Sequence, residues 1–248
     1  MNQIKTGPFA KILALILLAS LLILVFTWYT SEPDIINNMH SENHTTFINL
    51  PAPEIAGDVS VEEAISSRRS VRNLQEKPLN VFELSQLLWS AQGITYPERD
   101  FRSAPSAGAT YPLKLYVIVC KNGVDEQNIE TGVYLYVPKE NILKLITKED
   151  IRSDIYQFAL MQAPLDSAPV IIVMAADMSR TTDRYGERGV RYVHMEAGHS
   201  AQNIYLQATA MELGMVVIGA FDDRNVKRSI KMDMDHDPLY IIPIGYPY

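Results

Sequence analysis

The stretch 102–119, with the sequence RSAPSAGATYPLKLYVIV, places a loop of small residues directly before an apolar strand. Small side chains over residues 103–109 allow the backbone to approach a flat or phosphorylated ligand with its amide groups exposed. Pro105 and Pro112 stiffen the two ends of the loop, and the β-branched, apolar residues 115–120 predict a buried strand after it. The stretch therefore predicts a cofactor-binding loop, with an ordinary Ser/Gly/Pro turn as the alternative.

The overall composition excludes several classes of function. The chain has 248 residues, of which 47% are hydrophobic, enough for one sizeable folded domain and an appendage. A formal net charge of −7 offers no basic face, so we expect no nucleic-acid partner. The single cysteine, Cys120, rules out an intramolecular disulfide and a CxxC metal pair, and the five histidines form no HExxH motif. We therefore predict no metal site.

Residues 1–30 predict an N-terminal membrane anchor. Residues 12–28 are almost entirely apolar, and as a helix they would extend about 25 Å, just enough to cross a bilayer. Two lysines precede this run and two acidic residues follow it, which predicts a cytoplasmic N-terminus and a folded domain outside. A cleaved signal segment with secretion of the protein is the alternative. Residues 31–57 predict a polar linker, and residues 58–248 predict the folded domain.

A basic cluster follows the first helix of that domain, which the sequence predicts over Val61–Ser67. The cluster consists of Arg68, Arg69, Ser70 and Arg72, and we call it the arginine cluster. Guanidinium groups bind phosphate through paired hydrogen bonds, and a serine hydroxyl adds one more. The cluster is therefore a candidate phosphate site, and a solvated basic turn is the alternative.

The remaining pattern predicts an α+β sandwich, with a central, mostly antiparallel sheet flanked by helices. The predicted strands are 115–120, 132–138, 170–175, 215–221 and 239–246. The predicted helices are 61–67, 80–93, 139–147, 149–161, 190–213 and 222–231. We expect Gly93 to end the second of these helices in the left-handed conformation. The polar run 177–189 predicts a surface loop or lid.

Three polar residues in the predicted helices have open roles. Gln92 could face the small-residue loop, although an exposed helix end is the simpler interpretation. Glu196 and His199 are three residues apart in the longest predicted helix, so their side chains could touch as an acid/base pair. A structural pair is the alternative.

From about residue 60 to residue 248, the chain resembles the nitroreductase family, and most closely its SagB-type dehydrogenase branch. The motifs that carry the resemblance are, in order, RRSVR, LLWSAQGIT, PSAGATYPLKLYVIV, RYVHMEAGHSAQNIYLQATAMELGMVVIGAF and PLYIIPIGYP. The resemblance implies an α+β sandwich that binds FMN. It also implies a homodimer with its two flavin sites at the subunit interface, and residues 190–213 would belong to the dimer core.

The resemblance further implies roles for individual residues. Those implied to hold the FMN phosphate are Arg68, Ser70 and Arg72, with Arg69 nearby. Those implied to line the ring or the ribityl chain are Pro105, Ser106, Ala107 and Gly108. Those implied to offer backbone amides to the redox-active edge of the flavin are Val217, Ile218 and Gly219.

The chain departs from the family pattern in two places. Many members carry a basic residue shortly after the GYP segment, whereas this sequence stops at Tyr248, so Arg72 or a partner chain would complete the phosphate site. In azoline-oxidising relatives a Lys-Tyr pair is implicated in catalysis, and the nearest match here is Arg184-Tyr185. Arginine stays protonated and cannot act as a base, so Arg184 does not match the lysine of the azoline-oxidising relatives in this respect.

The function expected from the resemblance is FMN-dependent oxidoreduction, with a hydride passing through flavin N5. The substrate would be a small molecule or a modified peptide, and NAD(P)H is a candidate electron donor. One alternative is an NAD(P)H-dependent nitro or quinone reductase. A second alternative is a membrane-tethered protein that holds flavin without catalysis.

Overall fold

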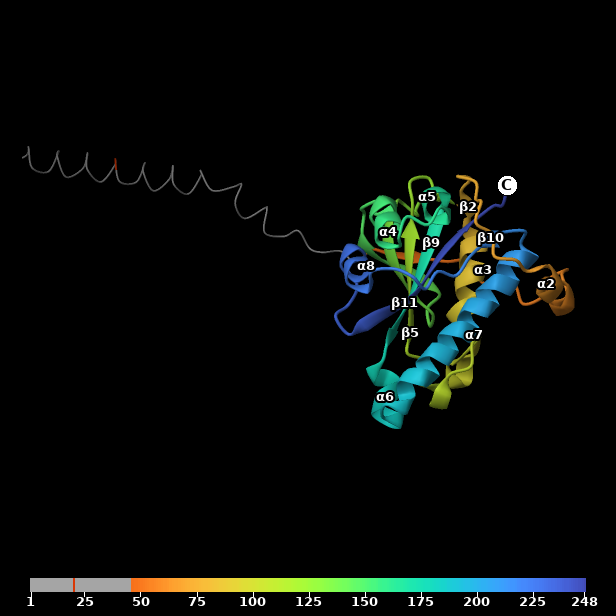
Figure 1. Ribbon diagram of the computed structural model, residues 1–248, viewed down its shortest axis with the longest axis vertical. Helices are drawn as coiled ribbons and strands as arrows, with labels where there is room; N and C mark the ends of the chain where they lie inside the picture. The colour runs from red at the N-terminus through yellow and green to blue at the C-terminus, as the bar shows by residue number, and fades with distance from the viewer. Residues whose placement is uncertain (1–19, 21–45) are drawn as a thin grey trace, which may run out of the picture. The chain divides into compact units, whose positions relative to one another are not determined.

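The computed structural model describes Ser20 and residues 46–248, and its centre is an antiparallel sheet of seven strands (Figure 1). In spatial order the strands are β1 (Phe47–Asn49), β8 (Ile142–Thr147), β7 (Gly132–Val137), β5 (Leu113–Val119), β9 (Val170–Asp177), β11 (His236–Gly245) and β10 (Gly214–Met215). Helices flank this sheet, so the predicted α+β class with an antiparallel sheet is confirmed.

Two layers of helices cover the sheet, one on each face. The helices that pack on one face are α3 (Val81–Gln92) and α7 (Arg188–Ala210). Those that pack on the other are α4 (Arg152–Phe158), α5 (Pro164–Ser167) and α8 (Asp223–Ser229). The other elements are α2 (Val61–Ser67), α6 (Ser179–Tyr185), the pairs β2 (Leu79–Asn80) with β6 (Val124–Asp125) and β3 (Ile94–Tyr96) with β4 (Phe101–Arg102), and the 3-10 turns η1 (Pro97–Arg99) and η2 (Ala107–Ala109).

Strand β9 explains why the chain folds into three layers. Its residues Ile172 and Met174 belong to the core under α3 and α7, whereas Ile171 and Val173 belong to the core under α4, α5 and α8. Because successive side chains of a strand point to opposite faces, an apolar strand must be covered on both sides. The prediction of a central strand is confirmed, since β9 lies between β5 and β11.

Helix α7 packs closely on α3 through a stripe of small residues. Ser200 donates a hydrogen bond to the Ala91 carbonyl oxygen at 2.8 Å, and Asn203 donates to the Ser90 carbonyl oxygen at 3.1 Å. Figure 1 shows α7 running from α6, at its N-terminal end, toward α2. The two ends of α7 therefore support different parts of the candidate site described below.

Two element predictions in the middle of the chain are wrong. The helix predicted over 139–147 is strand β8, which pairs with both β7 and β1. Its apolar residues have helix-like spacing, but pairing in the sheet decides the structure, and Asn141 makes the turn with φ +50°. The loop predicted over 177–189 contains α6, where Asp177 accepts hydrogen bonds from both the amide and the hydroxyl of Ser179.

Two predictions of backbone geometry also need correction. Of the strand predicted over 215–221, only Met215 lies in a strand, as the last residue of β10. Ile218 makes an isolated bridge with Ile241. Gly93 ends α3 in an extended conformation, with φ −65°, and not in the predicted left-handed one. Glycine is required there because a Cβ would overlap the Trp89 side chain.

The sheet begins earlier in the chain than predicted. Strand β1 lies inside the segment 31–57 that we expected to be a linker, and its Ile48 is buried in the core. The anchor predicted over residues 1–30 falls, apart from Ser20, outside the described residues. Across Ser20 and residues 46–248, the structure contains no helix that is both long and apolar enough to span a bilayer.

Candidate functional site

The arginine cluster lies where α2 ends, against the C-terminal part of α7. Arg68 follows the last residue of α2, and its guanidinium carbon is 4.9 Å from the centre of the Tyr205 ring of α7. The Ser70 hydroxyl lies 3.0 Å from the Tyr205 hydroxyl. Tyr205 therefore holds the cluster against α7, through a cation–π contact and a hydrogen bond.

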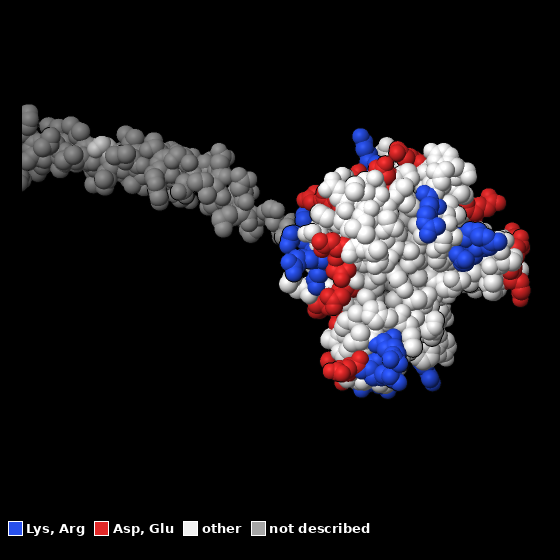
Figure 2. All heavy atoms as spheres, in the orientation of Figure 1, with Lys and Arg blue, Asp and Glu red and all other residues white. Residues whose placement is uncertain are grey.

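The cluster carries positive charge that no carboxylate of residues 46–248 neutralises in an ion pair. Arg69 donates to the backbone oxygens of Ser66 and Arg68, at 2.9 and 2.8 Å, while Ser70 and Arg72 are exposed. Figure 2 shows basic side chains gathered between α2 and β10, with acidic side chains on the outer side of α2. Exposed guanidinium and hydroxyl donors without a carboxylate partner suit a phosphate group.

The segment 217–219 meets the same tyrosine, but only part of it is free to bind a ligand. The Val217 amide donates to the Tyr205 hydroxyl at 3.1 Å. The Ile218 amide donates to the Ile241 carbonyl oxygen at 2.9 Å, so the amides of Val217 and Ile218 do not face a ligand as predicted. Gly219 is exposed, and its amide has no hydrogen-bond partner among the described residues. Of the three predicted amide donors, the structure leaves Gly219 available.

The small-residue loop and the Arg184-Tyr185 pair lie together. The Ser106 hydroxyl oxygen accepts a hydrogen bond from the Tyr111 amide at 2.9 Å and thereby shapes the loop. Gly108 has φ +60°, in the left-handed region, and its carbonyl oxygen accepts from Arg184 Nη1 at 3.0 Å. A Cβ on Gly108 would lie 2.5 Å from the Tyr185 hydroxyl oxygen. The predicted catalytic pair therefore borders the predicted flavin loop, in which Pro105 is exposed and Ala107 is half-buried.

The loop and the arginine cluster lie on opposite flanks of α7. Asn203, seven residues after Glu196 and therefore on the same flank of the helix, donates to the Ser103 carbonyl oxygen at 3.3 Å, whereas Ser70 bonds to Tyr205. Glu196 and Tyr205 are nine residues apart, so at about 100° per residue they point in opposite directions, about 13 Å apart along the helix. Among the described residues, no hydrogen bond or ion pair joins loop residues 105–108 to the arginine cluster.

Comparison with known proteins decides the family. The family model described as Nitroreductase matches residues 65–246, which is most of the chain. The protein belongs to the nitroreductase family. It is 42% identical over 201 residues to a protein of Methanocaldococcus jannaschii whose name assigns it to the nitroreductases, and the alignment covers 81% of this chain and 96% of the relative.

This nitroreductase-family protein is also similar to a solved structure and to a second named protein. A nitroreductase-type structure from Ralstonia eutropha superimposes with a TM-score of 0.69 at 25% identity, covering 82% of this chain and 90% of that one. The microcin B17-processing protein McbC of Escherichia coli is 24% identical over 156 residues, covering 62% of this chain and 57% of McbC. Family membership makes this chain an oxidoreductase of nitroreductase type.

Behind the loop, Gln92 of this nitroreductase-family protein is fully buried. The sequence favoured an exposed helix end, and that interpretation is wrong. Gln92 Oε1 accepts a hydrogen bond from Arg102 Nη1 at 2.9 Å, and the Arg102 guanidinium also lies over the Tyr111 ring, 4.8 Å from its centre. Burial and the nearby Arg180 lower the pKa of Arg102. Gln92 thus faces the loop and fixes a partly buried arginine at its start.

Glu196 and His199 do not form the acid/base pair that their spacing allowed. Glu196 is 2% exposed, whereas His199 points to solvent. Burial raises the pKa of Glu196 to about 7, although Ser106 and the guanidinium groups of Arg102 and Arg180 act in the opposite direction. Glu196 is therefore a buried carboxyl that titrates near neutral pH.

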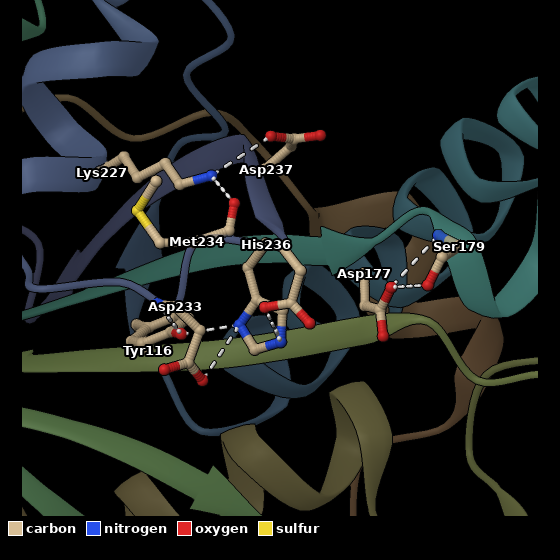
Figure 3. Close-up of polar contacts among 9 residues, drawn as sticks. Tyr116, Asp177, Ser179, Lys227, Asp233, Met234, His236 and Asp237 are labelled. Atoms are coloured by element: carbon tan, nitrogen blue, oxygen red, sulfur yellow. Dashed lines mark hydrogen bonds and ion pairs between the residues drawn. The ribbon is translucent and has the colours of Figure 1, made fainter.

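A second buried polar cluster, drawn in Figure 3, lies between β5 and the segment before β11. The Tyr116 hydroxyl is 2.7 Å from His236 Nδ1 and accepts a hydrogen bond from the Asp233 amide at 3.2 Å. Burial lowers the pKa of His236 and raises that of Tyr116 to about 12. Across the described residues, no three His, Cys, Asp or Glu side chains group as metal ligands. This cluster ties the chain ahead of β11 to the central sheet.

Sequence reasoning missed Tyr205 and Arg102. Tyr205 joins the arginine cluster to Val217, but in the sequence it is one of several large residues in a long helix. Arg102 had a detectable signal, since it is a basic residue directly before a loop of small residues. Its partner Gln92 becomes evident only when strand β4 returns the chain to the end of α3.

Proposed function

We propose that this protein is an FMN-dependent oxidoreductase of the SagB-type dehydrogenase branch. The observation that carries the proposal is the link, through the Tyr205 hydroxyl, between the arginine cluster and the segment 217–219. Within residues 46–248, no carboxylate pairs with the cluster and the Gly219 amide has no hydrogen-bond partner. The cluster suits a phosphate, and an exposed glycine amide suits a polar ring edge.

Bound FMN would accept two electrons as a hydride at N5 and pass them to a second substrate. The chain's own groups would hold it and set its surroundings. Arg68, Ser70 and Arg72 would hold the phosphate, and the Gly219 amide would donate to the edge of the ring. Ser106 and Gly108 of a second copy would lie against the ring.

A second copy is part of the proposal because one chain carries the two halves of the site on opposite flanks of α7. In a two-fold dimer, the loop of one copy can reach the arginine cluster of the other. Apolar surface beside the cluster supports this arrangement. Val61, at 64% exposure, borders a groove of about 370 Å³ that is also lined by Trp89 and Leu206.

Mixing two inactive variants tests the shared site. Arg68→Ala disables the cluster and Ala107→Trp fills the space beside the loop. When both variants are co-expressed, mixed dimers should contain one intact site, so about a quarter of all sites should hold FMN. If the two halves lie in one chain, no site recovers. In the matched control, Arg68→Ala is co-expressed with Arg228→Ala, a variant on α8 with an intact arginine cluster. The share of sites that hold FMN should then equal the share of Arg228→Ala chains, because only those chains carry an intact cluster.

Two substrate classes fit this flavin chemistry. The similarity to McbC, which is named as a microcin-processing protein, favours oxidation of a modified peptide, with Tyr185 beside the reacting group. The similarity to the Methanocaldococcus jannaschii protein, which is named as a nitroreductase, favours reduction of nitro compounds. For this class we propose NAD(P)H as the electron donor and quinones as further acceptors. Turnover of NAD(P)H with a quinone would support the second class, and peptide-dependent reduction of the flavin would support the first.

We also propose that residues 1–30 anchor the protein, with the folded domain outside the cytoplasm. The lysines before the apolar run and the acidic residues after it support this orientation. Protease added to intact cells should digest the domain while a cytoplasmic marker survives. Protection of the domain together with the marker would contradict the proposal, and release of the domain into the medium would indicate cleavage.

A further inference from the structure

Two arginines of α6 donate hydrogen bonds to backbone oxygens at the end of the small-residue loop. Arg184 Nη1 donates to the Gly108 carbonyl oxygen at 3.0 Å, and Arg180 Nε donates to the Thr110 carbonyl oxygen at 2.9 Å. The two arginines are four residues apart, so they lie on one face of the helix, about 6 Å apart along its axis. Among the described residues, their other N–H groups have no hydrogen-bond partner. The loop therefore holds both guanidinium groups in place through one N–H each and leaves the rest available to a ligand.

Arg102 brings a third guanidinium group to the same part of the loop. Its guanidinium carbon lies 4.8 Å from the centre of the Tyr111 ring, and its Nη1 donates to Oε1 of the fully buried Gln92 at 2.9 Å. Tyr111 directly follows Thr110, the residue that accepts from Arg180. Arg102 Nε and Gln92 Nε2 are buried without a partner among the described residues. Unpaired buried polar atoms cost stability, so the position of this arginine indicates a role other than stability.

No carboxylate pairs with these three positive charges. Within residues 46–248, no ion pair joins a carboxylate to Arg102, Arg180 or Arg184. Glu196 acts electrostatically on Arg102, but burial raises the pKa of Glu196 to about 7, so it supplies about half of one negative charge at neutral pH. Figure 2 shows basic side chains gathered over α6, with acidic side chains to one side of them. Like charges repel one another, so three guanidinium groups held around one loop suit an anionic ligand.

We propose that Arg102, Arg180 and Arg184 bind an oxyanion group, a carboxylate or a phosphate, on the substrate that reacts at the small-residue loop. The proposal rests on the proposed flavin function, in which this loop lies against the flavin ring. Guanidinium groups bind both oxyanions through paired hydrogen bonds. The same site therefore suits the acid group of an electron acceptor and the phosphate of a nicotinamide donor. The arginines would hold and orient the substrate, and the flavin would supply the redox chemistry.

Two matched pairs of compounds separate these two sources of the oxyanion. The first pair is 4-nitrobenzoate and its methyl ester, which differ by the charge of a carboxylate. The second pair is nicotinamide mononucleotide and nicotinamide riboside, which differ by a phosphate. Each compound is titrated into the full-length protein loaded with FMN, and binding is followed by the change in flavin absorbance. The flavin and all four ligands are oxidised, so no turnover accompanies binding.

The variants are Arg180→Gln and Arg184→Gln, with Arg191→Gln as the control. Arg180 and Arg184 are exposed, so their replacement should leave the melting temperature nearly unchanged. Arg191 is an exposed arginine of α7 that makes no hydrogen bond to the loop. Its replacement removes the same charge from the same end of the molecule, and therefore measures the effect of net charge alone.

The wild type should bind the charged member of at least one pair at least about tenfold more tightly than the uncharged member. Arg180→Gln and Arg184→Gln should each weaken binding of that charged member by about fivefold to tenfold, and should change the uncharged member by less than about twofold. The preference for charge should shrink between about 50 mM and about 500 mM salt. Arg191→Gln should keep it. The pair that responds identifies the substrate that carries the oxyanion.

Equal affinities within both pairs would overturn the inference and leave the proposed function intact. So would a preference that Arg191→Gln reduces as much as Arg180→Gln does. Loss of FMN from Arg180→Gln would also overturn the inference, because this arginine would then hold the cofactor itself. Wild-type protein that binds no FMN would overturn the proposed function, and the inference with it.

Discussion

The unfolding free energy of the wild type should fall as pH rises toward 7, because Glu196 is buried. Replacing Glu196 by glutamine should remove most of this fall. The carboxyl is 2% exposed, and burial raises its pKa from the ordinary 4.5 to about 7. Each pKa unit between the folded and unfolded chains is worth about 1.4 kcal/mol, so the difference amounts to about 3 kcal/mol.

The sign follows from where the proton is held. Between about pH 4.5 and about pH 7 the folded chain keeps the Glu196 proton while the unfolded chain has lost it. The free energy of unfolding therefore falls as pH rises through this window, and this contribution is constant above about pH 7. Glutamine cannot ionise, so Glu196→Gln should lack this decline.

Urea denaturation of the full-length chain without flavin, at pH 5 and at pH 8, measures the effect. The loss of unfolding free energy between the two pH values should be about 2.5 kcal/mol larger for the wild type than for Glu196→Gln, because part of the window lies below pH 5. Ser200→Ala, which deletes one buried hydrogen bond to Ala91, should lower the unfolding free energy by about 1 kcal/mol equally at both pH values. Equal pH dependence of wild type and Glu196→Gln would refute the assignment of a buried, proton-holding carboxyl.

Three other substitutions probe the flavin site and the loop. Arg68→Ala should weaken FMN binding by about 2 kcal/mol, roughly 30-fold, in a fluorescence titration, while Arg228→Ala on α8 should not change it; equal affinities would remove the phosphate assignment. Tyr205→Phe keeps the ring under Arg68 but loses the hydroxyl, so FMN should bind about tenfold more weakly with little change in melting temperature; unchanged affinity would mean that this hydroxyl does not organise the site. Gly108→Ala forces a side chain into a left-handed residue against Tyr185, and should lower the unfolding free energy by about 1 to 3 kcal/mol; an unaffected denaturation midpoint would contradict the geometry at Gly108.

The sequence predicted the elements whose local signals agree with their tertiary surroundings. Helix α2 lies where predicted because a capping serine marks its start. Strand β9 lies where predicted because its run of residues is apolar on both faces of the strand. Strand β8 was mistaken for a helix because its spacing is ambiguous, and only its partners β7 and β1 decide it. Helix α6 was missed because its residues are mainly polar and their contacts come from α7 and the small-residue loop.

The candidate site was predicted in its parts but not in its arrangement. Motifs identified the arginine cluster, the small-residue loop and the segment 217–219 separately. Helical spacing alone puts Glu196 and Tyr205 on opposite flanks of α7, but nothing in the sequence shows which loop packs on which flank. The Val217 amide bonds to the Tyr205 hydroxyl, 12 residues away, and the Ile218 amide bonds to Ile241 of β11. These partners could not be read from the sequence and became visible only in the structure.

The most direct test of the account is an FMN titration of the full-length protein, combined with its mass in solution. We predict one FMN per chain in a dimer, with a flavin absorbance that a chemical reductant bleaches. Colourless protein that added FMN cannot reconstitute, or one FMN held by a monomer, would contradict the claim that two copies of this chain share a flavin between the arginine cluster of one and the small-residue loop of the other.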